Sequence, residues 1–415
     1  MTMIGGTFAD SRRQISETLR KNTIGYAAHV MIYAVAFSVF LPYYIASAVI
    51  ALIGITFCVF PGTRDKIFCH KGSFLMLVFT LTSAVVSLCY GNRVGLARTG
   101  IFAAMMVVSL VARGLATKRF YERMLNCFII GGSLSTVGCI IERIVHADDT
   151  GYRCKAFFTN PNFFGTAIML VILVCAYKAV THTVHVYLYY IAAVFNAVSI
   201  YLCGSMGLWF VLFIGILILL ILNHEYKLLA IFMAIVACVC VAIVMIPELV
   251  PRLNELLATT NNRVKIWSFA VEQIKEAPIF GRGFFSYRFL YREMVTARPE
   301  LYKAALCHNL LFESMLSFGI VGTAMIGAYL ITFFKAILQN HDELKRRGHR
   351  YVVTTFIAAL SVAIACYGMI DTTVVWVQTG MIILLIFSGI GVDERELRHL
   401  HNIERAKNLQ EQQQA

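Results

Sequence analysis

Long apolar runs separated by short polar stretches constrain the fold of this chain more than any other feature. A bilayer core takes ~20 apolar residues of helix, and lipid offers the backbone no hydrogen-bond partner. We therefore predict an all-α, polytopic transmembrane helical bundle of about twelve spans, although short runs could instead pair into fewer, kinked helices. The runs lie near residues 24–40, 42–60, 73–90, 98–113, 124–142, 162–180, 184–202, 205–222, 227–246, 309–335, 351–370 and 372–390.

The composition excludes a soluble protein and argues against nucleic-acid binding. The chain is 59% hydrophobic and only 14% charged, whereas soluble domains carry about 25% charged residues. Its net charge of +13 comes from basic residues in short clusters between apolar runs. This distribution favours contact with lipid headgroups and control of membrane topology. We expect a lipid bilayer as partner and no nucleic acid.

The bias of Lys and Arg predicts the orientation. With about twelve spans, the short basic loops fall on one side, so both termini are expected in the cytoplasm. No cleavable signal peptide is expected, because the polar N-terminal segment leads directly into a full-length apolar run. The predicted segments are 1–23 (cytoplasmic), 24–246 (spans one to nine), 247–308 (large extracytoplasmic loop), 309–391 (spans ten to twelve) and 392–415 (cytoplasmic tail).

Three segments expected outside carry positive charge against this topology rule. They are 91–98, with Arg93 and Arg98, the stretch 143–162, and the long loop 247–308. Snorkelling to lipid phosphates or pairing with glutamates explains any single arginine. As a group they indicate a cationic chamber suited to a phosphate-bearing ligand. The basic residues of the long loop are Arg252, Arg263, Lys265, Lys275, Arg282, Arg288, Arg292, Arg298 and Lys303.

The long loop has internal order of its own. Apolar residues at helical spacing predict a short amphipathic helix over 262–277 that carries Arg263 in its first turn. There, helix amides and a guanidinium could converge on one anion, although an exposed helix-start arginine has the same pattern. Gly281-Arg282-Gly283 predicts a sharp turn. Cys154 and Cys307 are both expected outside, where a disulfide is possible but free thiols are favoured.

These residues carry a resemblance to a known family. The order Asn262-Arg263…Trp267, Pro278…Gly281-Arg282-Gly283, His308-Asn309 and Gly319…Gly322 is similar to the signature of the O-antigen ligase/polymerase family. Asn160-Pro161-Asn162 also resembles a family element at the start of a span. The signature covers about 60 residues, together with a compatible twelve-helix plan with its large outer loop.

The resemblance implies an enzyme in the bacterial cytoplasmic (inner) membrane. It would move a glycan from an undecaprenyl diphosphate carrier to a glycan or lipid acceptor outside. His308 matches the essential histidine of the family, and Arg263 matches an arginine of its outer loop. The sequence departs from the family after Ser205, where Met206 stands in place of a second arginine. This departure favours a polymerase over a ligase and leaves open how the diphosphate is held.

Glycosyl transfer from a lipid diphosphate needs charge and position. His308, with an ordinary pKa near ~6.5, is a candidate base for the acceptor hydroxyl, or else an orienting group. No metal and no cofactor are expected. We predict that Arg93, Arg98, Arg282 and Arg288 bind the diphosphate, and that Asn309, Glu313, Asp371 and Asn162 orient the reacting groups.

Two other classes of protein remain open. A lipid-linked oligosaccharide transporter or flippase would place ionisable groups at the bilayer midplane, whereas here the span centres are nearly free of charge. A structural or signalling membrane protein would not explain the arginines on the outer side.

Overall fold

The computed structural model describes residues 25–68, 70, 72–149, 151–182, 184–246, 256–294, 306–349 and 352–414. These residues form helices without β-strands, which confirms the all-α class. After a helix over Gly25–Ser38 the elements are α2 (Tyr43–Val59), α3 (Pro61–Ile67), α4 (Ser73–Cys89), α5 (Arg93–Leu115), α6 (Lys118–Val145), α7 (Pro161–Thr181), α8 (Val186–Leu202), α9 (Met206–Leu222), α10 (Tyr226–Met245), α11 (Leu256–Glu276), α12 (Ser286–Met294), α13 (Leu310–Arg346), α14 (Val352–Gly368), η4 (Thr373–Val375), α15 (Val377–Phe387) and α16 (Ile390–Gln414).

Several of these helices are those of a membrane protein. Among the described residues, six helices are long and apolar enough to cross a bilayer, and α2 and α3 form one further pair bent by 100°. Five shorter apolar helices accompany them. Each apolar run found in the sequence overlaps one of these helices, but the count of about twelve spans stays a prediction.

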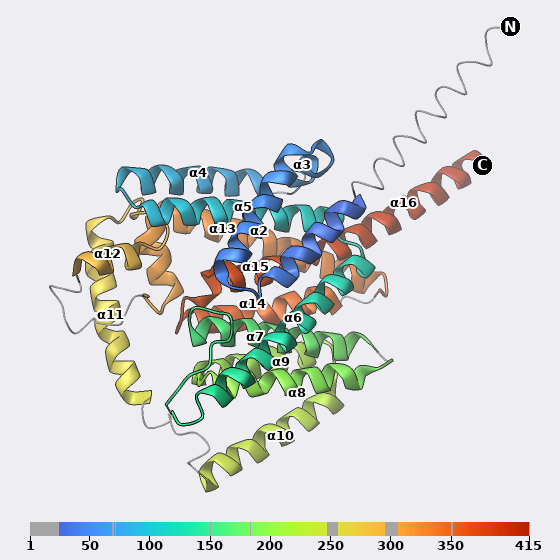
Figure 1. Cartoon of the computed structure of the whole chain (residues 1–415). Helices are drawn as coiled ribbons and strands as arrows, with labels where there is room; N and C mark the ends of the chain where they lie inside the picture. Colours follow the sequence, from blue (N-terminus) through green and yellow to red (C-terminus); the bar gives the residue numbers. More distant parts are fainter. Residues whose placement is uncertain are drawn as a thin grey trace.

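Helix α7 lies at the centre of the bundle, and α10 lies at its edge. In the most apolar window of α7, 83% of the residues are buried, because α6, α8, α9 and α15 all pack against it. The corresponding value for α10 is 0%. Figure 1 shows α10 apart from the other helices, next to α8 and α9. A helix so exposed and apolar is suited to lipid contact.

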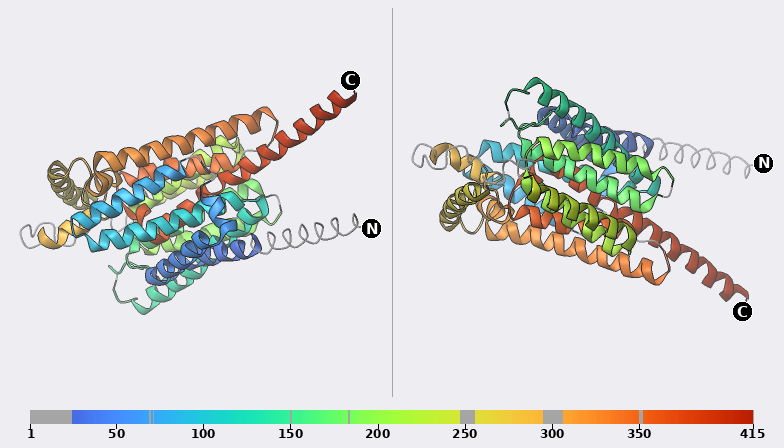
Figure 2. Two further views of the ribbon diagram at one scale, coloured as in Figure 1. Left: turned by 90° about the horizontal axis from the view of Figure 1, so that it is seen from above. Right: turned by 90° about the horizontal axis from the view of Figure 1, so that it is seen from below.

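The two ends of the bundle differ in what they carry. Figure 2 shows α11 and α12 beyond one end, whereas α16 extends away from the opposite end. We call these the His308 end and the Glu394 end. The expected outer loop falls partly outside the described residues, namely at 247–255 and 295–305, as does the predicted N-terminal segment 1–23.

Helix α11 begins earlier than the sequence pattern predicted. It starts at Leu256 and not near Asn262, because residues 256–261 contain neither Gly nor Pro and continue the helix upstream. Arg263 therefore lies in the third turn. The prediction that Arg263 shares an anion with the amides of the first turn is wrong.

A kink in α13 receives the segment that follows α11. Gly319 has a φ of 59° inside the helix, and a Cβ there would lie 2.3 Å from the Ile279 carbonyl oxygen. The opened backbone pairs with this segment: Arg282 N donates to Leu316 O at 3.0 Å, and Ile320 N donates to Pro278 O at 2.9 Å. Gly281 and its neighbour Gly283 have φ of 64° and 89°, so the predicted turn is present.

Candidate active site

His308 lies in the short connection that leads into α13. Its φ of 52° is unusual for a residue other than glycine. The residues on either side hold this bend. The Trp267 Nε1 of α11 donates to Cys307 O at 3.1 Å. Asn309 caps α13 by accepting from Leu311 N at 3.0 Å, and its Nδ2 donates to Met369 O at 3.1 Å. The connection is thus tied to α11 and to the end of α14.

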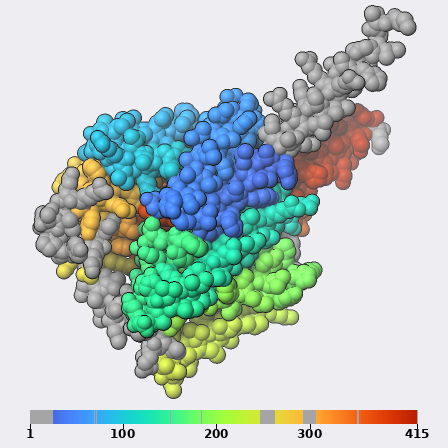
Figure 3. Space-filling view, viewed as in Figure 1, coloured from blue at the N-terminus to red at the C-terminus, as the bar shows by residue number. Residues whose placement is uncertain are grey.

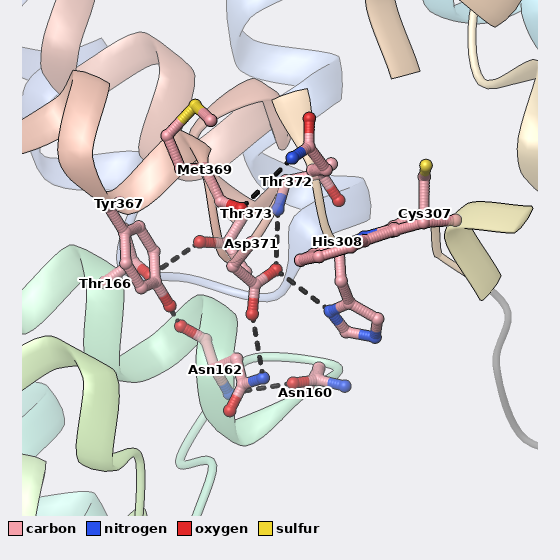
Figure 4. Close-up of polar contacts among 12 residues, drawn as sticks. Asn160, Asn162, Thr166, Cys307, His308, Tyr367, Met369, Asp371, Thr372 and Thr373 are labelled. Atoms are coloured by element: carbon pink, nitrogen blue, oxygen red, sulfur yellow. Dashed lines mark hydrogen bonds and ion pairs between the residues drawn. The ribbon is translucent and has the colours of Figure 1, made fainter. Parts of the chain in front are cut away.

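The side chain of His308 faces a buried carboxylate. Its Nδ1 lies 3.4 Å from Asp371 Oδ1, and the side chains are 23% and 3% exposed. Asp371 follows α14, and its Oδ1 also accepts from Thr372 N at 2.7 Å. Nδ1 is buried and makes no aligned hydrogen bond, and its distance of 3.4 Å from Asp371 Oδ1 is slightly longer than a usual hydrogen bond. Figure 4 shows the second ring nitrogen, Nε2, on the side of the ring away from Asp371.

Asn162 holds the other side of the carboxylate from the first turn of α7. Asn160 caps this helix by accepting from Asn162 N at 2.8 Å, with Pro161 at the first helical position. Asn162 Nδ2 donates to Asp371 Oδ2 at 3.1 Å. The structure therefore brings together His308, Asp371 and Asn162, three residues from segments far apart in sequence (Figure 4).

This arrangement suits a general base. The Asp371 carboxylate at Nδ1 favours the tautomer that carries its proton on Nδ1, which leaves a lone pair on Nε2. Nε2 could then take a proton from a hydroxyl group. Cys307 is not a competing nucleophile, because burial raises the pKa of its thiol. Both Cys307 and Cys154 are free, which confirms the favoured expectation of free thiols.

Arg98 of α5 lies in a box of three aromatic rings. Its guanidinium carbon is 4.3 Å from the ring centre of Trp376, with Phe285 and Tyr43 at 5.4 and 5.8 Å. Trp376 stacks on Phe163, the neighbour of Asn162, at 4.4 Å. Trp376 thus connects the box to the segments that carry Asp371 and Asn162. Figure 3 shows one face of the molecule, on which the blue, green and orange parts of the chain meet with a small red area between them.

The other arginines predicted for the site differ in their exposure. Arg288, exposed on α12, is close enough to Arg98 for their charges to interact. Arg93 is exposed at the start of α5. Arg263 is half-buried one helical turn before Trp267, on the face of α11 that is tied to the His308 connection. Within the described part of the chain, Arg263 makes no hydrogen bond or ion pair.

Two predicted site residues are engaged elsewhere. Arg282 is 8% exposed, pairs with Glu276 at 2.7 Å and donates to Gln273 O at 2.9 Å, so α11 already neutralises its charge. Glu313 is buried in α13, where its Oε1 accepts from Ser317 at 3.1 Å. Among the described residues Glu313 makes no contact with His308 or Asp371.

The sequence did not single out one residue of this network. Arg153, in the connection between α6 and α7, donates from Nη2 to Asn162 Oδ1 at 2.6 Å and from Nε to Cys203 O at 2.8 Å. The sequence feature that could have indicated Arg153 was its place in a basic segment expected outside, nine residues before Asn162.

Part of the chain matches a known protein family. Residues 191–327 match the family model described as O-antigen ligase. The matched stretch runs from α8 into α13 and includes Arg263, Arg282 and His308, whereas Asn162 and Asp371 lie outside it. No curated protein matches the chain.

Proposed function

We propose that the chain transfers a glycan from an undecaprenyl diphosphate carrier to an acceptor outside the cytoplasmic membrane, because residues 191–327 match the family model described as O-antigen ligase. The match supports a membrane glycosyltransferase of the ligase type. The contact between His308 and Asp371 carries the mechanistic part of the proposal, because it supplies a base next to a set of arginines.

The chemical step is a single displacement. The acceptor hydroxyl attacks the anomeric carbon of the donor and gives its proton to His308 Nε2. The bond from the anomeric carbon to the phosphate oxygen breaks, and its electron pair leaves with undecaprenyl diphosphate. This step inverts the anomeric centre. Asp371 then stabilises the imidazolium, as the carboxylate does in a catalytic triad.

Guanidinium groups hold the negative charge that develops on the leaving diphosphate. Arg98, Arg263 and Arg288 are suited to this role, because among the described residues none of them pairs with a carboxylate. Stacking engages the flat face of Arg98 and leaves the N–H groups at its edge for phosphate oxygens. We propose that these charges serve in place of a divalent cation, so that transfer is independent of metal. Arg93 is a fourth candidate at the same end.

The acceptor distinguishes a polymerase from a ligase. We favour a polymerase, in which the acceptor is a second carrier-linked glycan, because Met206 replaces the arginine that ligases share after Ser205. Sizing the glycans of cells with and without the chain tests this choice. Loss of a ladder of lengths indicates a polymerase, whereas a ladder retained on the carrier lipid indicates a ligase.

The decisive assay uses purified full-length protein in nanodiscs with a defined undecaprenyl diphosphate oligosaccharide. We expect His308→Ala to lower kcat by about 10²–10⁴-fold, the usual contribution of a general base. His349→Ala is the matched control, because that ring is 40% exposed beside Glu396 at the Glu394 end. Wild-type turnover in both His308→Ala and Arg263→Ala would refute the proposal. Donor flux across liposomes without glycan bond formation would indicate a transporter instead.

A further inference from the structure

The connection between α6 and α7 is held rigidly by one carboxylate. Glu142, near the end of α6, accepts from Lys155 N at 2.9 Å, from Ala156 N at 2.7 Å and from the Tyr152 hydroxyl at 2.7 Å. Cys154 N donates to Leu202 O at 3.2 Å. Arg153 lies between these anchored residues. Its side chain therefore starts from a fixed backbone.

The guanidinium of Arg153 joins two segments at the His308 end. Its bond to Cys203 O reaches the turn before α9, where the ligase pattern would place an arginine and this chain has Met206. Its bond to Asn162 Oδ1 determines which way the amide of Asn162 faces. A planar guanidinium can hold two such acceptors at once, which a lysine ammonium does less well.

The orientation of this amide determines the orientation of Asp371. With Oδ1 of Asn162 bound to Arg153, its Nδ2 points at Asp371 Oδ2. Thr372 N holds the other oxygen, so the carboxylate presents Oδ1 to the imidazole. If the amide turned over, its oxygen would face a carboxylate oxygen and the donor would be lost.

We infer that Arg153 is a positioning residue that acts through Asn162 and Asp371 to hold the imidazole of His308 for proton transfer. The inference rests on the proposed function, because it assigns Arg153 a part in that reaction. A positioning residue affects the chemical step more than donor binding. We therefore expect Arg153→Ala to lower kcat by about 10–100-fold while the KM for the donor changes little.

A double-mutant cycle distinguishes positioning from direct contact with the diphosphate. The variants are Arg153→Ala, Asn162→Ala and the double variant, assayed with the undecaprenyl diphosphate oligosaccharide donor. If Arg153 acts through Asn162, the double variant loses no more kcat than Asn162→Ala alone. Arg153→Lys keeps the positive charge but loses the planar fork that reaches both acceptors, so it should recover part of the loss. Lys155→Ala, which removes an exposed charge of the same sign two residues away, should leave kcat unchanged.

Other outcomes would overturn the inference. Losses of kcat that multiply in the double variant, or a large rise in KM with Arg153→Ala, would assign Arg153 to diphosphate binding. An equal loss of kcat with Lys155→Ala would mean that the effect comes from the positive charge of this connection and not from the contacts of Arg153. If His308→Ala retains turnover, the proposed function itself fails. If His308→Ala is inactive while the Arg153 and Asn162 losses multiply, only the positioning role fails.

Discussion

The two ends of the bundle contain the same kinds of cation but hold them differently. At the Glu394 end the cations bind carboxylates. Lys178 pairs with Glu122, Arg113 pairs with Glu394, and Arg347 lies 2.7 Å from Glu404. At the His308 end aromatic rings surround the guanidinium of Arg98, which pairs with no carboxylate among the described residues.

This difference separates structural charge from charge kept for a ligand. A paired cation has already gained its electrostatic stabilisation from the protein. A cation held by aromatic rings retains its charge for an incoming anion. Arg282 is the exception at the His308 end, because it pairs with Glu276. We therefore assign Arg282 to the fixing of the turn after α11.

Among the changes that test this comparison, the largest effect should follow from removing an unpaired arginine at the His308 end. We expect Arg98→Ala to lower kcat by about 10²–10³-fold, the range for losing one donor to a developing oxyanion. The kcat of Arg98→Lys should lie between that of the wild type and that of Arg98→Ala, because lysine keeps the charge and loses the planar stacking. The measurement is transfer kinetics in nanodiscs, with Lys265→Ala, an exposed cation of α11, as control. Full activity of Arg98→Ala would remove Arg98 from the site.

Removing a paired cation at the other end should change stability and leave catalysis intact. The Lys178 side chain is 1% exposed, so Lys178→Ala leaves Glu122 without its main partner. Breaking a buried pair costs about 3–5 kcal/mol. We expect a lower unfolding temperature and an unchanged kcat per folded molecule. Replacing both partners, Lys178→Met with Glu122→Leu, should restore part of the stability. A loss of kcat in thermally stable Lys178→Ala would contradict the division between the two ends.

The sequence predicted the helices well because their signal is local. An apolar run of membrane length forms a helix whatever its neighbours are, so α7 and α13 arise where expected. The start of α11 was missed because Thr259, Thr260 and Asn261 interrupt the apolar pattern after Leu256, although residues 256–261 contain no helix breaker. The kink at Gly319 was missed because the glycine alone does not reveal the segment that docks there.

The site was predictable to the extent that its residue types are unusual for their place. The sequence indicated a histidine and an asparagine at the start of a membrane span as site residues, and the structure places His308 and Asn162 in contact with Asp371. The role of Arg153 was not predictable, because a backbone carbonyl such as that of Cys203 has no sequence signal. Arg282 and Glu313 fitted the pattern equally well, and only their buried partners set them apart.

A smaller effect should come from ionic strength. Unpaired arginines that attract a diphosphate are screened by salt, since the Debye length falls from about 10 Å at 0.1 M to about 3 Å at 1 M. We expect the KM for the donor to rise several-fold over this range. The unfolding temperature should change little, because the pair between Lys178 and Glu122 is largely buried. A KM that is independent of salt would indicate that arginine charge contributes little to donor binding.

The smallest effect at neutral pH concerns His70, between α3 and α4 near the Glu394 end. Burial, with the nearby charge of Arg113, lowers the pKa of His70 to about 4. A lowered pKa means that His70 contributes stability above its ordinary value of 6.5, and that this contribution is lost as the pH falls towards about 4. We therefore expect unfolding temperatures at pH 7 and pH 4.5 to differ less in His70→Asn than in the wild type. His349→Asn is the control, because that ring is 40% exposed beside Glu396. An equal acid response in His70→Asn and wild type would show that this histidine does not make the Glu394 end sensitive to acid.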